Sequence, residues 1–218
     1  MVAETLSVRL ARLRREYSAA GLAVSDLDPD PVPQFTAWFD TAVETGISEP
    51  NAMTLATASR AGVPSARTVL LKGYDERGFV FFTNYTSRKG SELAANPQAA
   101  LVFPWIQLQR QVIVIGAAKR VRRAESAAYF ATRPRGAQIS AWASAQSAVI
   151  TGRSALLAAR DEIEQRYADR AVPLPPTWGG VRVVPRTIEF WQGRADRTHD
   201  RLRYRRSKGG WVIERLAP

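Results

Sequence analysis

The chain of 218 residues contains no cysteine, a single histidine and only four lysines. Without cysteine, disulfide bridges and thiolate metal sites are excluded, and a reducing compartment is expected. With one histidine, a zinc site would have to rest mainly on carboxylates, so we expect no metal. No apolar run approaches the length of a transmembrane helix, and the N-terminus lacks the apolar segment of a signal peptide. We therefore expect a cytoplasmic protein that does not associate with a membrane.

Several common catalytic motifs are also missing. The sequence has no phosphate-binding glycine loop, no Gly-x-Ser-x-Gly elbow and no spacing typical of metal ligands. A serine hydrolase would have to use His199 as its base, with no elbow to hold the nucleophile. We therefore do not expect a hydrolase of this type.

The net charge of +11 is carried almost entirely by arginine. Such an excess attracts polyanions, so nucleic acid must be considered as a partner. The arginines are spread along the chain, however, and arginine also suits bidentate binding of small phosphates and carboxylates. A codon bias towards arginine is a third explanation. Charge alone does not choose between these three interpretations.

The spacing of apolar residues by three or four predicts a helix over residues 3–19 and another over residues 33–44. The segment between them, residues 21–33, is rich in Gly, Asp and Pro and predicts a loop. We therefore expect a flexible N-terminal arm over residues 1–30, followed by a single domain over residues 31–218.

From residue 52 onwards the apolar period changes to two, which predicts strands. The expected strands cover residues 53–59, 66–73, 78–84, 98–105, 109–121, 181–184, 187–192, 201–206 and 211–216. We expect a hairpin between 66–73 and 78–84, and another across the Ser-Lys-Gly-Gly turn near the C-terminus. Further helices are expected over residues 87–96, 124–132 and 153–168. Because strands outnumber helices without alternating regularly with them, the pattern favours a mainly β or α+β fold built on an antiparallel barrel.

The segment from Glu189 to Arg201 holds the single histidine, His199, between Arg197 and Arg201. If the segment is extended, these three side chains lie on one face, because side chains alternate in a strand. Two guanidinium groups and an imidazole on one face suit an anionic, planar ligand. A solvated basic edge strand with a chance histidine is the alternative.

Other polar clusters suggest anion binding. Residues 83–89 run from an expected strand into a helix N-terminus, which offers free N–H groups, hydroxyls and two cations to a phosphate. Tyr129 and Arg133 are spaced to share one face of a helix. A capped helix and a salt-bridged surface are the respective alternatives. Gln111 and the pair Gln146–Ser147 could form hydrogen bonds to a heterocycle, although singly they carry little information.

Taken together and in this order, the motifs resemble the pyridoxine/pyridoxamine 5′-phosphate oxidase family over about residues 35–218. The arm sequence Arg14-Arg-Glu-Tyr17 is similar to the segment that covers the site in that family. The motifs that carry the resemblance are Arg67-x-Val-Leu-Leu-Lys72, Ser87-Arg-Lys89, Phe103-Pro-Trp105, Arg110-Gln111, Arg133-Pro-Arg135, Gln146-Ser147, Glu189-Phe-Trp-Gln-Gly193, Arg197-x-His199-Asp-Arg201 and the C-terminal Trp211-Val-Ile-Glu-Arg-Leu-Ala-Pro218.

The resemblance implies an FMN-binding split β-barrel that works as a homodimer, with the flavin at the subunit interface. It implies oxidation of pyridoxine or pyridoxamine 5′-phosphate by O₂ to pyridoxal 5′-phosphate, with release of hydrogen peroxide and, from the amine, ammonia. The residues implied in FMN binding are Arg67, Thr83, Arg88, Lys89, Gln111, Gln146, Ser147, Trp191 and Arg201. Those implied in substrate binding are Lys72, Tyr129 and Arg133 at the phosphate, Arg197 and His199 over the flavin as the catalytic pair, and Arg14 and Tyr17 in the lid.

Two positions depart from the family pattern. Ala137 replaces the usual serine near the substrate phosphate, and Phe82 replaces a frequent tyrosine. Loss of one neutral hydroxyl donor costs about 1 kcal/mol, so we expect weaker substrate binding and retained activity. The alternatives are a related split-barrel flavin oxidase acting on another substrate, such as a phenazine precursor, and a non-enzymatic nucleic-acid binder or B6-phosphate carrier. The Lys72 and Arg133-Pro-Arg135 motifs favour the B6 phosphate, and we expect no nucleic-acid partner.

Overall fold

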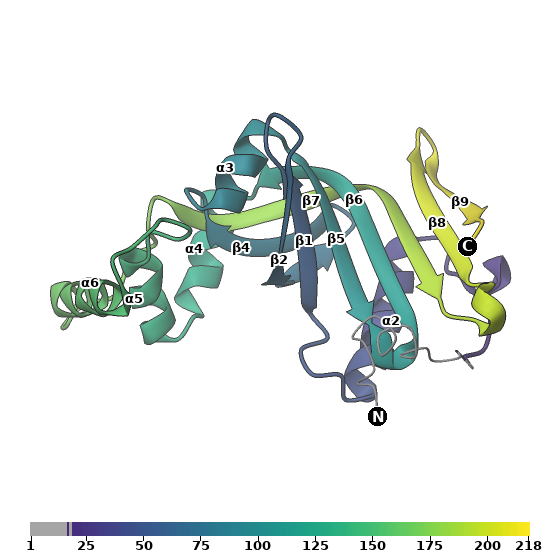
Figure 1. Ribbon diagram of the computed structural model, residues 1–218, viewed down its shortest axis with the longest axis horizontal. Helices are drawn as coiled ribbons and strands as arrows, with labels where there is room; N and C mark the ends of the chain where they lie inside the picture. The colour runs from purple at the N-terminus through teal and green to yellow at the C-terminus, as the bar shows by residue number, and fades with distance from the viewer. Residues whose placement is uncertain (1–16, 18) are drawn as a thin grey trace, which may run out of the picture.

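The computed structural model of the chain describes Tyr17 and residues 19–218. Within them, a nine-stranded sheet is antiparallel at every pairing (Figure 1). Its strands are β1 (Ala52–Ala58), β2 (Pro64–Leu70), β3 (Gly73–Asp75), β4 (Gly78–Asn84), β5 (Gln98–Trp105), β6 (Arg110–Arg120), β7 (Trp178–Gln192), β8 (Asp200–Ser207) and β9 (Gly210–Leu216). The helices are α2 (Pro31–Glu44), α3 (Arg88–Ala95), α4 (Arg123–Ala131), α5 (Arg135–Ala143) and α6 (Arg153–Arg166), with 3-10 turns η1 (Val24–Asp26), η2 (Ile106–Leu108) and η3 (Ala195–Arg197). The expected antiparallel sheet with flanking helices is confirmed.

The order of the strands forces the sheet to curl. In the path β2-β1-β5-β6-β7-β4-β3, the two edge strands are β2 and β3, yet only Leu71 and Lys72 join them in the chain. The three peptide steps of this link span at most about 11 Å, so the two edges approach each other. Leu71 is buried, and the Lys72 N–H donates to the Val80 carbonyl on β4 at 2.8 Å. Lys72 is therefore fixed at the seam of a half-barrel.

Helix starts follow local sequence signals. The Asp30 carboxylate accepts the Val32 N–H at 2.8 Å, and Pro31 occupies the first helical position, where a missing N–H costs little. In the same way, the Ser87 hydroxyl accepts the Gly90 N–H at the start of α3, as predicted. Both caps satisfy backbone donors that have no partner within the helix.

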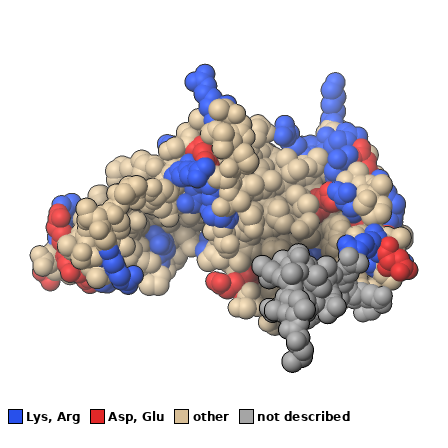
Figure 2. Space-filling view, in the orientation of Figure 1, with Lys and Arg blue, Asp and Glu red and all other residues tan. Residues whose placement is uncertain are grey.

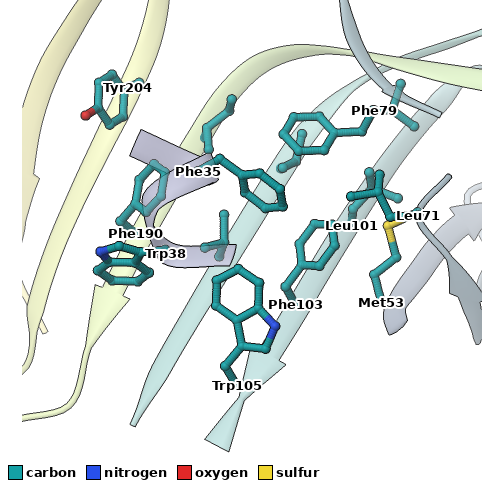
Figure 3. Packing of buried hydrophobic residues seen from close by; sticks show 14 of the residues in the cluster. Phe35, Trp38, Met53, Leu71, Phe79, Leu101, Phe103, Trp105, Phe190 and Tyr204 are labelled. Carbon is teal, nitrogen blue, oxygen red and sulfur yellow. The ribbon is translucent and has the colours of Figure 1, made fainter. Parts of the chain in front are cut away.

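The main core lies between α2 and the sheet. Phe35 is fully buried, and its ring centroid is 5.0 Å from those of both Phe79 and Phe103. Further along α2, Trp38 meets Phe190 edge to face at 5.1 Å. Figure 3 shows these rings interlocking between the helix and the strands. Aromatic pairs in this geometry contribute free energy beyond the burial of their area.

The helices α4, α5 and α6 gather at one end of the molecule, opposite β8 and β9 (Figure 1). They have a separate, smaller core, which includes Phe130, Ile139 and Ile163 and reaches Trp178 at the start of β7. Through Trp178, the first residue of β7, this second core attaches the three helices to the sheet.

Strand β7 is continuous over 15 residues, whereas the sequence predicts two strands interrupted near Pro185. One edge of β7 pairs with β6, and the other pairs first with β4 and then with β8. Pro185 lies between these two partners, where a missing N–H breaks no ladder hydrogen bond. Opposite it, the register of β6 shifts between Ile115 and Gly116, and such a bulge bends a strand. The expectation of two separate strands is therefore wrong.

Two further expectations need correction. The strand expected over residues 66–73 is divided into β2 and β3, so β2 pairs with β1, and only the short β3 forms the hairpin with β4. Helix α5 is absent from the sequence prediction, because the prolines and glycine around it indicate a break. The other strands and helices from residue 31 onwards lie where the sequence predicts them, including the hairpin between β8 and β9.

The helix expected over residues 3–19 lies outside the described residues, apart from Tyr17 and Ala19. The division into an arm of residues 1–30 and a domain of residues 31–218 stays a prediction. Among the helices that the structure describes, none has the length and apolar character needed to cross a bilayer.

Replacing Phe35 by Ala is expected to lower the free energy of unfolding by about 3–5 kcal/mol, because it leaves a cavity at the centre of the aromatic core. Urea denaturation at one fixed protein concentration would measure this. Val43→Ala on the exposed side of the same helix is the control, with an expected change within about 0.5 kcal/mol. Equal losses in the two variants would contradict the assignment of Phe35 to the centre of the core.

Candidate functional site

A cavity of about 530 Å³ opens at the seam where β2 faces β4. This size is typical of a ligand site. The residues that line it come from β2, β4, α3, α4, α5, the start of β7 and the loops next to them. They are Thr68, Val69, Leu70, Lys72, Phe82, Thr83, Asn84, Lys89, Tyr129, Arg133, Ser140, Ala141, Ser144, Gln146 and Trp178. Six of the predicted site residues are therefore brought together: Lys72, Thr83, Lys89, Tyr129, Arg133 and Gln146.

Three cations of this cavity, Lys72, Lys89 and Arg133, make no ion pair with any carboxylate that the structure describes. Cations gathered without a counter-charge produce a positive potential that favours an anionic ligand. The cavity therefore has the charge expected of a phosphate site.

Arg133 gives the most direct indication that the cavity binds an anion. Its Nη1 atom is buried and has no hydrogen-bond partner within the described part of the chain. The guanidinium lies 4.7 Å from the ring centre of Trp178, and burial lowers the pKa of Arg133. A buried guanidinium nitrogen without a partner is costly, and an anion in the cavity would remove that cost.

An aromatic stack shapes the wall beside Arg133. The rings of Phe82 and Tyr129 are stacked with centroids 3.9 Å apart, and Phe82 also stacks on Trp178 at 5.4 Å. The prediction that Tyr129 and Arg133 share one helix is wrong in detail, because α4 ends at Ala131 and Arg133 follows its C-terminus. Both side chains nevertheless line the cavity.

A second polar group lies at the N-terminus of α3. The Lys89 ammonium donates to Gln146 Oε1 at 3.0 Å, and the Thr83 hydroxyl donates to the same oxygen at 3.3 Å. Burial, and then the charge of Arg67, lower the pKa of Lys89. Gln146 is thus brought against two residues of the segment 83–89, which lies far from it in the sequence. Ser147, the neighbour of Gln146, is exposed and has a positive φ of 76°.

The predicted cofactor residues Arg67 and Arg88 surround Glu92 and do not line the cavity. Arg88 Nε lies 2.9 Å from Glu92 Oε1, and Arg67 Nη2 lies 3.4 Å from Glu92 Oε2. Hydrogen bonds from Ser65 and Thr57, together with Arg88, lower the pKa of Glu92 to about 2. Glu92 therefore stays ionised at neutral pH and balances part of the positive charge behind the cavity.

The predicted residues of the C-terminal segment form a separate aromatic cluster of Tyr17, Trp191 and His199. The ring centroids of Trp191 and His199 are 4.7 Å apart, and Tyr17 meets both rings edge-on, at 5.8 Å and 5.6 Å. Gln111 lies on β6 in register with Trp191. Arg14, the other predicted lid residue, lies outside the described residues.

The prediction that Arg197, His199 and Arg201 project from one face of a strand is wrong. Residues 195–197 form η3, Arg197 has a positive φ of 58°, and β8 begins only at residue 200. A tight turn therefore replaces the extended segment, and the alternation of side chains does not apply to it.

His199 and Arg201 each have a specific partner. The Arg194 N–H donates to His199 Nδ1 at 3.1 Å. Because Nδ1 accepts this hydrogen bond, the ring proton is on Nε2, which is left as a donor. Arg201 makes a bidentate pair with Glu189, with Nε–Oε1 at 2.7 Å and Nη2–Oε2 at 3.2 Å.

The cavity and the aromatic cluster lie towards opposite ends of β7. Trp178, at the start of the strand, lines the cavity, and Trp191, near its end, belongs to the aromatic cluster. At about 3.3 Å per residue, the strand spans on the order of 45 Å along its length. Within one chain, the two groups of predicted site residues therefore do not converge on one small ligand.

Several lining residues were missed by sequence reasoning, namely Thr68, Asn84, Ser140, Ser144 and Trp178. Ser140 lies three residues beyond Ala137 on α5, so the helical spacing from the family's usual serine could have indicated it. Trp178 follows a proline-rich loop, and nothing in its local sequence distinguishes it from a core residue.

Comparisons with known proteins identify one family. Residues 39–167 match the family model described as pyridoxamine 5′-phosphate oxidase, and residues 178–218 match the pyridoxine 5′-phosphate oxidase C-terminal dimerisation region. A Salinispora arenicola protein named pyridoxine/pyridoxamine 5′-phosphate oxidase is 61% identical over 211 residues, covering 95% of this chain and 96% of that protein. A Rubrobacter xylanophilus protein of the same name is 58% identical over 209 residues, with 96% of each covered.

Solved structures show the same fold. PhzG from Burkholderia lata, in complex with tetrahydrophenazine-1-carboxylic acid, has a TM-score of 0.86 and 32% identity, covering 93% of this chain and all of that chain. An FMN-binding protein from Nostoc punctiforme, related to pyridoxamine 5′-phosphate oxidase, has a TM-score of 0.69 and 16% identity, covering 88% of this chain and all of that chain. At that identity, the second comparison speaks for the fold alone.

Arg133→Met is expected to leave the ligand-free protein at least as stable as the unmodified protein, because it removes a buried charge and keeps an apolar side chain against Trp178. The increase in melting temperature caused by inorganic phosphate should become smaller. Thermal denaturation with and without phosphate tests both statements. Arg60→Met, at an exposed position, is the charge-matched control. An unchanged phosphate effect in Arg133→Met would contradict the assignment.

Proposed function

The chain belongs to the pyridoxamine 5′-phosphate oxidase family, and we propose that it oxidises pyridoxine or pyridoxamine 5′-phosphate to pyridoxal 5′-phosphate with FMN as cofactor and O₂ as acceptor. The observation that carries this proposal is the buried, unpartnered Arg133 nitrogen in a cavity that also holds Lys72 and Tyr129. Relatives named for this activity are 53–61% identical to the chain over nearly its whole length.

The substrate phosphate would bind Lys72, Tyr129 and Arg133. One ammonium, one hydroxyl and one guanidinium suit a phosphate dianion, because hydrogen bonds between charged groups are the strongest available to it. Ala137 offers no hydroxyl, but Ser140 lies one turn further along α5 on the cavity wall. The expected weakening of substrate binding by Ala137 stays a prediction.

The residues around the N-terminus of α3 fit the phosphate of FMN. Lys89 is half-buried and has only neutral hydrogen-bond partners among the described residues, and it adjoins a capped helix start with free N–H groups. FMN would supply the two-electron acceptor that O₂ reoxidises. The residues proposed to hold it are Arg67, Thr83, Arg88, Lys89, Gln146 and Ser147 near the cavity, and Gln111, Trp191 and Arg201 near the aromatic cluster.

The protein's own contribution would be mainly binding and orientation. Arg197 and His199 would lie against the substrate ring, with Tyr17 covering them. Because His199 Nδ1 is occupied by the Arg194 N–H, the imidazole offers an Nε2–H donor, which can fix the orientation of a substrate oxygen or nitrogen. No side chain needs to act as a strong base, and most of the rate enhancement would come from positioning.

Complete sites would form only in a homodimer. The match of residues 178–218 to a dimerisation region supports a homodimer. In a two-fold dimer, each contact is repeated, so the cavity of one protomer can meet the aromatic cluster of its partner at two equivalent places. The distance along β7 between the cavity and the aromatic cluster is then explained, because each site would contain the cavity of one chain and the aromatic cluster of the other.

Two other functions are less well supported. The PhzG structure keeps the phenazine-precursor alternative open, but its 32% identity is well below the 53–61% of the relatives named as B6-phosphate oxidases. Nucleic-acid binding would need a continuous basic surface, whereas Figure 2 shows Lys and Arg in separate groups on the visible face. The absence of a nucleic-acid partner and the cytoplasmic location stay predictions.

Purified protein is expected to show a flavin absorption spectrum that bleaches when pyridoxamine phosphate is added without oxygen, because the substrate then reduces the cofactor. Readmission of air should restore the colour. Flavin that stays oxidised with both B6 phosphates would favour the phenazine-type alternative. Protein that remains colourless after FMN is supplied would overturn the proposed function.

Mixed dimers of Arg133→Met and Arg197→Met chains test the shared site. Each homodimer is expected to be nearly inactive. Random mixing should restore about one quarter of the normal activity, because half of the dimers are mixed and one of their two sites is intact. Co-expression with two different tags isolates the mixed dimers. Mixed dimers as inactive as the parents would show that both arginines act within one protomer.

A further inference from the structure

Residues 19–28, which we call the strap, lie against the C-terminal hairpin of β8 and β9. The Leu22 N–H donates to Asp200 Oδ2 at 3.0 Å, and Arg215 Nη2 donates to the Leu22 carbonyl, also at 3.0 Å. Leu22 and Leu27 are both buried. One residue of the strap is thus held through both of its backbone groups by side chains of two adjacent strands.

Other hydrogen bonds hold the strap on either side of Leu22. The Ala19 N–H donates to Gln109 Oε1 at 3.2 Å, and the Tyr204 hydroxyl donates to the Asp28 carbonyl at 2.7 Å. These contacts fix the path of the chain that leads back to Tyr17. Tyr17 lies two residues before this anchored segment in the sequence, so the hairpin limits the positions that its ring can take.

Asp200 connects the strap to two arginines. Its Oδ1 atom lies 2.5 Å from Arg215 Nη1, and its Oδ2 atom lies 3.7 Å from Arg194 Nη1. Burial alone would raise the pKa of Asp200, but the Leu22 N–H and the two arginines outweigh it and lower that pKa. Asp200 is therefore ionised at neutral pH, so its carboxylate can accept the Leu22 N–H and pair with both arginines.

Arg194 connects Asp200 to His199. Arg194, whose side chain pairs with Asp200, donates its backbone N–H to His199 Nδ1. Tyr17 packs edge-on against His199, and a Cβ atom on Gly193 would lie 2.9 Å from the Tyr17 ring. Asp200 thus bonds to the strap that carries Tyr17 and to the residue that sets the His199 tautomer.

We propose that Asp200 is a positioning residue that couples the N-terminal strap to the orientation and tautomer of His199. Its carboxylate holds the strap through Leu22 and the His199 turn through Arg194, so that Tyr17 and His199 are placed together. The effect of this coupling on catalysis rests on the function proposed above. The coupling itself is a property of the chain and can be measured without turnover.

The single histidine of the sequence makes a direct test possible. Untagged protein labelled with ¹⁵N-histidine gives one imidazole, whose two nitrogen shifts report the tautomer. In the unmodified protein we expect one protonated and one unprotonated nitrogen. In Asp200→Asn, which keeps the shape and removes the charge, the two shifts should move towards each other as the tautomers mix.

Hydrogen exchange measures the other half of the coupling. Exchange of the Leu22 amide should become roughly tenfold faster or more in Asp200→Asn, because a hydrogen bond to a charged acceptor is replaced by one to a neutral amide. Asp169→Asn, an exposed change of the same charge at the helical end, is the matched control and should alter neither signal.

Two further variants separate the position of the Tyr17 ring from the anchoring of Leu22. Gly193→Ala should displace the Tyr17 ring and leave the exchange of the Leu22 amide unchanged. Arg215→Gln removes the other side chain that holds Leu22, and it decides the question by the same two measurements if Asp200→Asn fails to fold. In steady-state assays, Asp200→Asn should raise the KM for pyridoxamine phosphate roughly tenfold and leave the flavin content per chain unchanged.

Simultaneous changes in the His199 shifts and in the exchange of Leu22 support the proposal. Faster exchange with unchanged His199 shifts would overturn it and reduce Asp200 to an anchor of the strap. Changed shifts with normal exchange would also overturn it, because the strap would then be uninvolved. Failure of the flavin test would remove the proposed function but leave both of these measurements, and the coupling they test, unaffected.

Discussion

The two-residue link between β2 and β3 is the constraint on which the rest of the structure depends. It joins the opposite edges of the seven-strand path, so the sheet curls until those edges face each other. Leu71 is buried there in the core, and Lys72 is left beside the opening between β2 and β4. A longer link would allow a flatter sheet, and the cavity would lose the wall that carries Lys72. The short link between β2 and β3 therefore explains both the curl of the sheet and the position of Lys72.

Strand β7 sets a second constraint, because it runs from the cavity at one end of the molecule to the aromatic cluster at the other. It pairs with β6 on one edge and with β4 and then β8 on the other, and Pro185 is tolerated only because it falls between those two partners. The same strand separates the cavity from the aromatic cluster by most of its length. Under the proposed function each site needs a second chain, and the match of residues 178–218, which cover β7, β8 and β9, to a dimerisation region supports a homodimer.

Features that depend on neighbouring residues could be predicted from the sequence, and features that depend on distant contacts could not. Ser87 as a helix cap and the Ser-Lys-Gly-Gly hairpin follow from local chemistry, and both are confirmed. The division of β2 from β3, by contrast, is decided by which distant strands they pair with. Similarly, the alternation expected of a strand around His199 fails at Arg197, where the chain adopts a positive φ. The family could be recognised from the order of the motifs, while the geometry had to come from the fold.

The distribution of charge separates arginines that pair with a carboxylate of the chain from cations that do not. Arg67 and Arg88 share Glu92, and Arg201 pairs with Glu189, so the chain itself balances part of the charge of these three guanidinium groups. The cations on the cavity wall have no such partner among the described residues, and one nitrogen of Arg133 is buried without any hydrogen bond. A buried polar atom without a partner costs free energy, so its presence in a cavity lined by cations favours a binding role for Arg133. Since His199 is held as a donor by Arg194, the chemistry that these residues favour is the binding and alignment of an anion. The oxidising power then has to come from the cofactor.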